Sequence, residues 1–372
     1  MTALDPALAR FRDAILQAAA GRAPLTLRGG GTKDFYGRAS APDATVLDTR
    51  EWSGIVDYDC AELVITARSG TPLAEVEAAL AEHRQMLAFE PPHFGGGGGQ
   101  ATVGGAFASG LSGPRRQSVG ALRDFVLGAV VMDGRGDLLN FGGQVMKNVA
   151  GYDVSRLMAG ALGTLGLVVQ VSLKVLPMPF CDATLRFAMP QDEAIGTLNR
   201  WGGQPLPIAA SAWIDGTLWV RLCGADAAVR AARARLGGDR VDEAEALALW
   251  RDLREQSHAF FARAVQGSLP LWRIALPPAT PPLAPAQAAA DEQLIEWGGG
   301  QRWWIDTGDT PADAVRDIAR KAGGHATLFR NGDRSGAVFT PVAAPLMAVH
   351  KRLKDSFDPH GIFNPGRLYA GF

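Results

Sequence analysis

The chain contains 372 residues, carries a formal net charge of −1 and is 47% hydrophobic, the composition of a globular protein with more than one domain. Its basic residues are dispersed, which argues against a nucleic-acid-binding protein. It has no stretch of about 18 to 20 apolar residues and no basic-then-apolar N-terminal region, so neither a membrane span nor a secretory signal is predicted.

The predicted elements of the N-terminal half are short strands and helices. In chain order they are a helix over 5–21, strands over 25–27 and 63–67, a helix from 71 to about 84, a hairpin of strands 126–132 and 138–141, and a half-buried strand over 169–175. Asp5 followed by Pro6 is typical of an N-cap and a first helical position, and Thr71 followed by Pro72 repeats this pattern.

The predicted elements of the C-terminal half alternate as well. They are a hairpin of strands 208–213 and 218–222, helices over 227–236, 243–264 and 311–322, strands over 303–305 and 327–329, a proline-rich loop over 277–285 and a final helix over 346–357. This pattern predicts a βαβ-type sheet with helices on one face, either single or duplicated.

Glycine and tryptophan divide the chain into two parts. Glycine is concentrated before about residue 170, whereas Trp52 is the one tryptophan of nine that precedes residue 200. We therefore expect a domain boundary at Pro177 and Pro179, where prolines end the strand over 169–175.

Two glycine-rich segments, 28–33 and 95–113, are suited to binding a pyrophosphate. Glycine leaves backbone N–H groups open to an anion and adopts the positive φ of an anion-binding turn. The first segment lacks the P-loop spacing and does not open a helix with G-x-G-x-x-G, which argues against a nucleoside triphosphatase and a nicotinamide-binding Rossmann unit. Gly95–Gly99 alone are equally well interpreted as a flexible loop.

An ordered series of motifs is more specific than either segment. It comprises the 28–33 loop, Ala101-Thr102-Val103-Gly104-Gly105, Gly110, Gly113, Gly120, Asp124, Gly151-Tyr152-Asp153, Gly163-Thr164-Leu165-Gly166 and the tail Phe357-Asp358-Pro359-His360-Gly361-Ile362-Phe363-Asn364-Pro365-Gly366. With this series the chain resembles the flavoprotein superfamily of vanillyl-alcohol oxidase and the D-2-hydroxy-acid dehydrogenases. Within it, the chain most resembles the smaller FAD-binding subunits of bacterial glycolate oxidases, over essentially its full length.

The resemblance implies an α+β fold in three parts. These are a two-subdomain FAD-binding domain of the PCMH/VAO type over 1–178 (subdomains about 1–55 and 56–178), an α+β cap domain over 179–340, and a C-terminal helix and tail over 341–372 that return to the FAD domain.

The resemblance also implies FAD as the cofactor, together with the residues that bind it. These are Gly29, Gly30, Gly31, Thr32, Lys33, Thr102, Gly104, Gly105, Ser109, Gly113, Gly163, Gly166, Val168 and Asn364. The alternative for Asn364 is a simple turn residue before proline. Relatives that tether FAD use His or Cys near the first loop; Lys33 stands there instead, and His93 matches that position poorly, so the FAD is expected to be non-covalent.

The sequence departs from the catalytic relatives in the cap domain. Those relatives carry a histidine-rich metal site, whereas the corresponding segment here, 325–333, has one histidine. The sequence therefore predicts no metal site. His325 as a remnant base and Arg330 as a carboxylate-binding residue are the catalytic candidates, against an exposed histidine and a structural ion pair.

Other reactive or charged residues are interpreted more simply. His350 and His360 are expected to be structural, and Arg115 and Arg116 either steer an acidic substrate or partner subunit or lie on the surface. The three widely spaced cysteines, Cys60, Cys181 and Cys223, are expected to be free, buried thiols of a reducing cytosol.

Three functions remain open at this point. The favoured one is an FAD-binding subunit of a multi-subunit glycolate oxidase or dehydrogenase, which holds FAD and takes part in electron transfer beside a second FAD-binding subunit and an iron–sulfur subunit. The alternatives are a self-sufficient FAD-dependent D-2-hydroxy-acid dehydrogenase and a non-catalytic scaffold with a flavoprotein fold. The expected location is the cytoplasm, either free or peripheral at the inner face of the membrane through partners.

Overall fold

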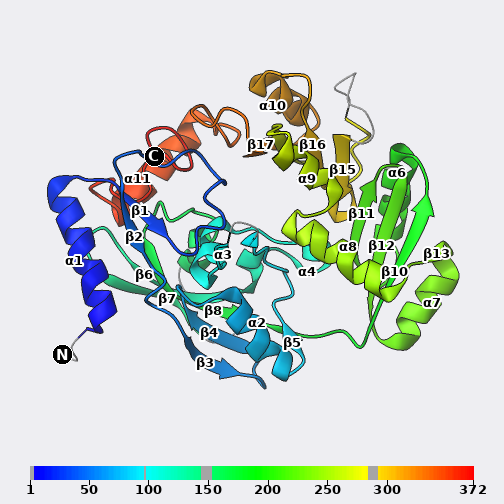
Figure 1. Cartoon of the computed structure of the whole chain (residues 1–372), viewed down its shortest axis with the longest axis horizontal. Coiled ribbons are helices and arrows are strands. Elements are labelled where there is room, and N and C mark those ends of the chain that lie inside the picture. The colour runs from blue at the N-terminus through cyan, green and yellow to red at the C-terminus, as the bar shows by residue number, and fades with distance from the viewer. Residues whose placement is uncertain (1–3, 96–97, 144–152, 284–291) are drawn as a thin grey trace.

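The computed structural model describes residues 4–95, 98–143, 153–283 and 292–372. Gly96, Gly97, Gly151, Tyr152 and Pro285, which belong to segments discussed above, lie outside the described residues. The chain forms two sheet-based parts, with the N-terminal part in blue and cyan and the second large sheet in green to yellow in Figure 1.

The N-terminal part is built on a five-stranded antiparallel sheet with strand order β3-β4-β8-β6-β7. Its elements are α1 (Pro6–Gly21), β1 (Leu25–Arg28), β2 (Thr45–Asp48), β3 (Ile55–Asp59), β4 (Val64–Arg68), α2 (Leu73–Glu82), β5 (Gln85–Met86), α3 (Val103–Ser109), α4 (Arg116–Val119), η2 (Leu122–Phe125), β6 (Val126–Met132), β7 (Leu138–Gly142), α5 (Val154–Met158), β8 (Leu167–Lys174) and β9 (Leu176–Pro177). The predicted hairpin is confirmed as β6 and β7, which pair from Met132–Leu138 to Gly128–Gly142.

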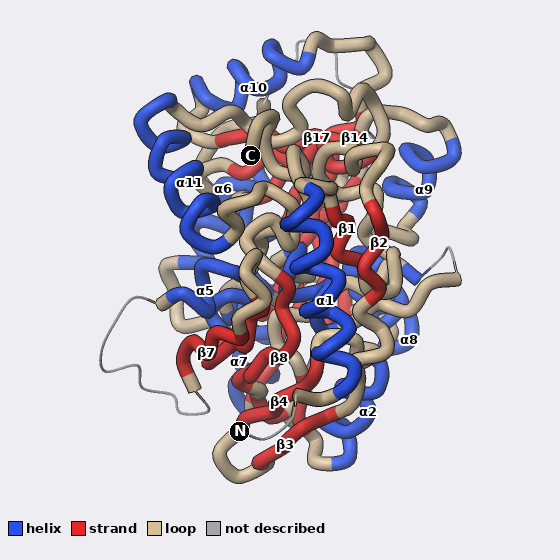
Figure 2. The backbone as a smooth tube through the Cα atoms, turned by 90° about the vertical axis from the view of Figure 1, so that its left-hand side faces the viewer, coloured by secondary structure: helices blue, strands red, loops and turns tan. Residues whose placement is uncertain are grey.

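The predicted half-buried strand is confirmed as part of β8, where Val169, Val171 and Leu173 are buried while Gln170 and Lys174 stay partly exposed. Val171 and Leu173 pack with the core formed by α2 and α3, whereas Leu167 and Val169 pack against α1. The contact with α1 is confined to the beginning of β8 (Figure 2).

Helix α1 begins as its sequence predicts. The side chain of Asp5 accepts a hydrogen bond from the Ala7 N–H at 2.9 Å, and Pro6 occupies the first turn. The prediction for α2 was one residue off: Pro72 is its N-cap residue, and the hydroxyl of Thr71 bonds the backbone of Gly54 instead of the helix.

The C-terminal part is built on an eight-stranded antiparallel sheet with strand order β13-β10-β12-β11-β15-β16-β14-β17. Its elements are β10 (Cys181–Ala188), α6 (Gln191–Gly202), β11 (Ile208–Ile214), β12 (Thr217–Gly224), α7 (Asp226–Leu236), β13 (Asp239–Arg240), α8 (Glu243–Glu255), α9 (Ala259–Gln266), β14 (Leu271–Ala275), β15 (Gln293–Glu296), η4 (Trp297–Gly299), β16 (Gln301–Ile305), α10 (Ala312–Lys321) and β17 (His325–Arg330). The final helix, α11 (Ala344–Phe357), packs on the N-terminal part instead.

This sheet is a duplicated unit, which confirms one of the two predicted forms. From one edge of the sheet the first unit runs β13, β10, β12, β11. From the opposite edge the second unit runs β17, β14, β16, β15, so that strands in the same order along the chain take the same places in space. The two units join through β11 and β15, where Trp213 pairs with Ile295.

Helices cover both faces of this sheet, so the expectation of helices on one face was wrong. α6 and α7 pack on the face that carries Trp213 and Ile295, and α8 and α9 pack on the face that carries Ala212 and Leu294. The predicted helix over 243–264 is also two helices, because Gln256 ends α8 in a left-handed conformation with φ 54°.

Four charged side chains join the two parts. Arg221 of the second sheet donates to Glu90 at 2.9 Å and to Asp182 at 2.6 Å, and Arg115 lies 3.3 Å from Glu90. Arg115 is only 5% exposed, so its interpretation as a surface residue was wrong.

The three cysteines are free, as expected, but they are not all buried. Cys60 is exposed, and Cys181 and Cys223 are half-buried.

The C-terminal tail returns to the N-terminal part, where Figure 1 shows it in red beside β1 and β2. The backbone N–H of Leu25 donates to Ile362 O at 2.7 Å, and the N–H of Asn364 donates to Leu25 O at 2.9 Å. The tail therefore adds a short bridge to β1, which is itself paired in parallel with β2.

Candidate functional site

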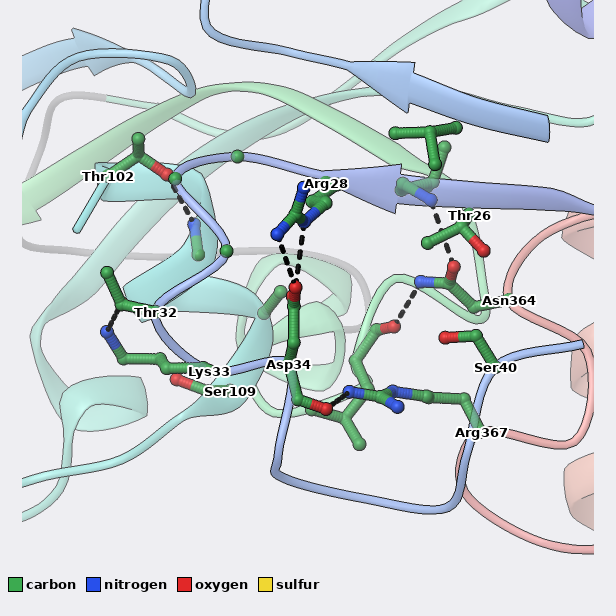
Figure 3. A pocket seen from close by; sticks show the side chains of 18 of the residues that line it. Thr26, Arg28, Thr32, Lys33, Asp34, Ser40, Thr102, Ser109, Asn364 and Arg367 are labelled. Carbon is green, nitrogen blue, oxygen red and sulfur yellow. Dashed lines mark hydrogen bonds and ion pairs between the residues drawn. The ribbon is translucent and has the colours of Figure 1, made fainter. Parts of the chain in front are cut away.

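A cavity of about 370 Å³ opens where the first glycine-rich loop, helix α3 and the C-terminal tail meet (Figure 3). It is lined by Thr26, Leu27, Arg28, Gly29, Gly30, Gly31, Thr32, Lys33, Asp34, Ser40, Ala41, Ala44, Val46, Thr102, Gly105, Ala108, Ser109, Leu162, Asn364 and Arg367.

A second cavity, of about 70 Å³, adjoins the first. The two share Leu27, Arg28, Gly29, Gly105, Ala108, Leu162 and Asn364, and the second extends to Thr49, Ser69, Gly104, Gly163, Gly166, Leu167 and Val168. Together they form one elongated groove between the two glycine-rich segments.

Backbone contact between the two glycine-rich segments shapes this groove. A Cβ at Gly30 would collide with the backbone carbonyl of Gln100, and Gly31 has φ +74°, a conformation that favours glycine. Gly105 differs, because a Cβ there would meet only the hydroxyl of Thr102, at 3.2 Å. Glycine at 30 thus serves the packing of the loops, while glycine at 105 keeps the groove open.

Thr102 begins α3 at the floor of the groove. Its hydroxyl accepts a hydrogen bond from the Gly105 N–H at 3.2 Å and so acts as the N-cap (Figure 3). The short helix is fixed at its other end by the left-handed Gly110, with φ 63°.

Asn364 joins the tail to the groove through both ends of its amide. Its Oδ1 accepts from the Leu27 N–H at 2.9 Å, and its Nδ2 donates to Leu162 O at 2.6 Å (Figure 3). Asn364 is 9% exposed and has φ 39°, a conformation that asparagine tolerates better than most residues. Its role is therefore more than that of a turn residue before proline.

The groove carries positive charge that carboxylates do not balance. Lys33 donates to the Thr32 hydroxyl at 3.2 Å and has no ion pair among the described residues; burial lowers its pKa to about 8, although Glu255 opposes the shift. Burial also lowers the pKa of Arg367, which donates to Asp34 O at 2.8 Å. The carboxylate of Asp34 is paired with Arg28 at 2.7 Å. Both Lys33 and Arg367 are half-buried, and poorly solvated cations of this kind favour an anionic ligand.

The predicted cofactor residues lie along the groove with one exception. Gly113 lies instead where the N-terminal part meets the second sheet, in a small cavity lined by Arg273, Glu296 and other residues of both parts. Its carbonyl accepts from the Trp297 indole at 3.2 Å, which makes it a packing residue.

Sequence reasoning missed several lining residues. They are Thr26, Leu27, Arg28, Asp34, Ser40, Ala41, Ala44, Val46, Thr49, Ser69, Ala108, Leu162, Leu167 and Arg367. Arg28 begins the predicted 28–33 loop, Asp34 follows it directly and Arg367 follows the tail motif by one residue, so their positions in or beside the motifs were the available signal. The others have no distinctive sequence signal.

The two catalytic candidates lie far apart. His325 and Arg330 are the first and last residues of β17, which places them ~17 Å apart at the rise of an extended strand. Neither lines the groove. His325 is exposed, which confirms its alternative interpretation, and its pKa is lowered by partial desolvation and by the nearby Arg273 and Arg116.

Arg330 packs on an aromatic ring, with its guanidinium carbon 3.4 Å from the Phe35 ring centroid. It donates to Gln256 Oε1 at 2.9 Å and has no ion pair among the described residues, so the structural ion pair that was the alternative is not present in this part of the chain.

The described residues contain no group of three or more His, Cys, Asp and Glu side chains placed to hold a metal ion. In the same residues, the helices are all too short or too polar to cross a bilayer.

The fold and the groove define the class of protein. A family model described as an FAD-binding domain matches residues 9–142. A solved structure of alkyldihydroxyacetonephosphate synthase superposes with a TM-score of 0.64 at 13% identity, over 96% of this chain and 75% of that chain. The protein is an FAD-binding flavoprotein with the vanillyl-alcohol oxidase fold, which confirms the predicted fold class and cofactor.

The sequence comparison defines the family more closely. The chain is 48% identical over 356 residues to the glycolate oxidase subunit GlcE of Escherichia coli (strain K12), covering 95% of each chain. It is 32% identical over 164 residues to the glycolate oxidase subunit GlcD of Bacillus subtilis (strain 168), covering 44% of this chain and 34% of that protein. It is 31% identical over 189 residues to the D-lactate dehydrogenase of Archaeoglobus fulgidus (strain ATCC 49558 / DSM 4304 / JCM 9628 / NBRC 100126 / VC-16), covering 50% and 41%. The chain belongs to the family of glycolate oxidase GlcE subunits.

Proposed function

We propose that this chain is the FAD-binding subunit of a multi-subunit glycolate oxidase or dehydrogenase, in which it holds FAD and takes part in electron transfer from the oxidation of a 2-hydroxy acid. The observation that carries the proposal is 48% identity to a glycolate oxidase subunit over 95% of both chains. The FAD groove supports it, because a non-catalytic scaffold would not need an open, positively charged groove between two glycine-rich segments.

The residues along the groove suit FAD, which supplies an electron acceptor when bound. The backbone of the 29–32 loop and the start of α3 offer N–H groups to the pyrophosphate, and Lys33 and Arg367 offer positive charge. Asn364 holds the tail that closes the groove. We further propose that the FAD is non-covalent, since none of the described residues that line the groove is His or Cys.

Partner subunits complete the oxidation in this proposal. Hydroxyl oxidation needs a base beside the bound substrate. Neither catalytic candidate lines the FAD groove, and the two lie ~17 Å apart along β17. We therefore propose a second FAD-binding subunit as the site of efficient substrate oxidation and an iron–sulfur subunit as the onward electron carrier. The complex acts in the cytoplasm, and any contact with the inner face of the membrane is made through these partners.

The test is anaerobic bleaching of the flavin. The isolated chain, loaded with FAD, should be bleached by glycolate or D-lactate far more slowly than normal enzyme turnover. Addition of the second flavoprotein and the iron–sulfur subunit should restore rapid bleaching. Rapid bleaching of the isolated chain would contradict the proposal and make the chain a self-sufficient dehydrogenase.

A spectrum of the supernatant after acid precipitation tests the non-covalent attachment. The yellow colour should be released; colour retained in the pellet would indicate a covalent bond.

A further inference from the structure

The most deeply buried side chain of helix α11 is a charged one, although Met347, Leu353 and Phe357 also pack against the core of the N-terminal part. Of the residues of α11, all of which are described, only Lys354 is buried. Its ammonium donates to Thr164 O at 2.7 Å, to Phe363 O at 3.0 Å and to Asp358 Oδ2 at 2.7 Å. An ammonium has three protons, so these three bonds use its whole donor capacity.

Asp358 extends this set of hydrogen bonds into the tail. Its carboxylate accepts from the Ile362 N–H at 3.0 Å and from the Phe363 N–H at 2.8 Å, which closes the turn between α11 and the tail. The side chains of Lys354 and Asp358 are 7% and 0% exposed, so neither charge is compensated by water. The pair therefore fixes the tail in one geometry.

Two of the segments held by Lys354 line the FAD groove. Phe363 precedes Asn364, whose amide bonds Leu27 and Leu162. Thr164 follows Gly163, which lines the narrower end of the groove. Lys354 itself does not line the groove, so it can influence the cofactor only through these neighbours.

We infer that Lys354 is a positioning residue for FAD: its ammonium fastens the tail to the 161–164 turn and thereby holds Asn364 against Leu27 on one side of the cofactor. This inference rests on FAD occupying the groove. It extends the FAD site to a residue that touches neither the cofactor nor the groove.

The test compares FAD binding by Lys354→Met with binding by Lys351→Met, in the full-length chain. Lys351 is exposed on the same helix, so its replacement keeps the charge change but leaves the hydrogen bonds of Lys354 intact. The apoprotein is titrated with FAD and the quenching of flavin fluorescence gives the dissociation constant. Lys354→Met should raise the dissociation constant by about tenfold or more, the size of effect seen at metal sites when a residue that supports a ligand is removed. Lys351→Met should leave the dissociation constant unchanged.

Amide hydrogen exchange separates positioning from general stability. In Lys354→Met, exchange should accelerate at Leu27, Ile362 and Asn364, while the amides of β10–β17 keep wild-type protection. Equal FAD affinity in Lys354→Met and wild type would overturn the inference. Failure of the wild-type apoprotein to bind FAD would instead remove the cofactor assignment itself.

A double variant keeps the inference testable if Lys354→Met fails to fold. Lys354→Met combined with Asp358→Leu leaves no unpaired buried charge, and it should fold yet bind FAD as weakly as expected for the single variant. If the double variant also loses the protection of β10–β17, the pair serves the stability of the whole chain and the inference is wrong.

Discussion

Gly105 is a residue where added volume enters the FAD groove directly. It lines both cavities, and only the Thr102 hydroxyl stands near its missing side chain. Overpacking costs about 1 to 3 kcal/mol, so we expect Gly105→Val to fold but to bind FAD ~10-fold or more weakly. Flavin content per purified chain measures this.

Gly202 provides the matched control. It lies at the end of α6, and no atom stands within 4 Å of its missing side chain. Gly202→Val should retain full flavin content, and equal flavin in both variants would show that the groove does not hold the cofactor. For Gly30→Val we expect a different result. Its side chain would collide with the backbone of Gln100 and disturb the folded loops, whether or not FAD is bound.

Lys33 predicts how FAD affinity depends on pH. Burial lowers its pKa to about 8 in the protein without cofactor, and bound phosphates raise it. The protonated form binds FAD better, so affinity should be constant below pH ~8 and fall as the pH rises through that value. Fluorescence titrations between pH 6 and pH 10 would show this decline.

Two substitutions isolate the charge of Lys33. Lys33→Arg keeps its charge across the whole range and should bind FAD with no decline above pH ~8. Lys33→Met should bind weakly at every pH. A wild-type decline that persists in Lys33→Met would assign the titration to another group.

At the scale of the element, α3 depends on its N-cap. Thr102 is buried and caps the Gly105 N–H, and loss of such a cap costs about 1 kcal/mol. We expect Thr102→Ala to lower the free energy of unfolding of the apoprotein by that amount. Thr102→Ser keeps the hydroxyl and should change it by much less, as urea unfolding followed by circular dichroism would show.

Local sequence signals predicted the elements that depend on local chemistry. Asp5 and Pro6 specify the start of α1, and the 133–136 turn specifies the hairpin of β6 and β7, because caps and turns form within a few residues. The glycine-rich segments likewise identified the groove, since positive φ and close backbone approach restrict those positions to glycine.

Elements that depend on distant contacts could not be predicted in this way. The packing of α1 on Leu167 and Val169 joins segments more than a hundred residues apart, and the break at Gln256 interrupts a sequence that is continuously helical in pattern. Gly113 shares its motif with groove residues, yet Trp297 from the other part of the chain determines its surroundings. The hydrophobic periodicity and the composition of a segment do not depend on such distant contacts and so cannot predict them.

At the scale of the whole molecule, Arg221 couples the second sheet to the FAD-binding part. The side chains of Arg221, Glu90 and Asp182 are 11%, 16% and 33% exposed, so loss of Arg221 should cost less than the about 3 to 5 kcal/mol of a fully buried ion pair. Arg221→Met should nevertheless loosen Glu90 and Asp182 together. Trp52 is the one tryptophan of nine before residue 200, so tryptophan fluorescence reports mainly on the second sheet. In wild type, its urea transition should coincide with flavin release; in Arg221→Met, the two should separate.

Arg230→Met is the control for this experiment. Arg230 pairs with Asp226 on the exposed surface of α7, and an exposed pair of this kind contributes only about 0.3 to 0.5 kcal/mol. Its two transitions should still coincide. Separation in both variants would mean that the parts unfold independently without any contribution from Arg221.

The hydrogen bond between Leu27 and Asn364 spans 337 residues of sequence. Domains generally fold from the N-terminus as the chain is synthesised, at about 5 to 20 residues per second. The sheet of β3, β4, β6, β7 and β8 can therefore form early on the ribosome. The side of the FAD groove that Asn364 forms cannot be completed until residue 364 has emerged. Flavin acquisition is then a late event in biogenesis, and flavin content marks chains whose synthesis has passed that residue.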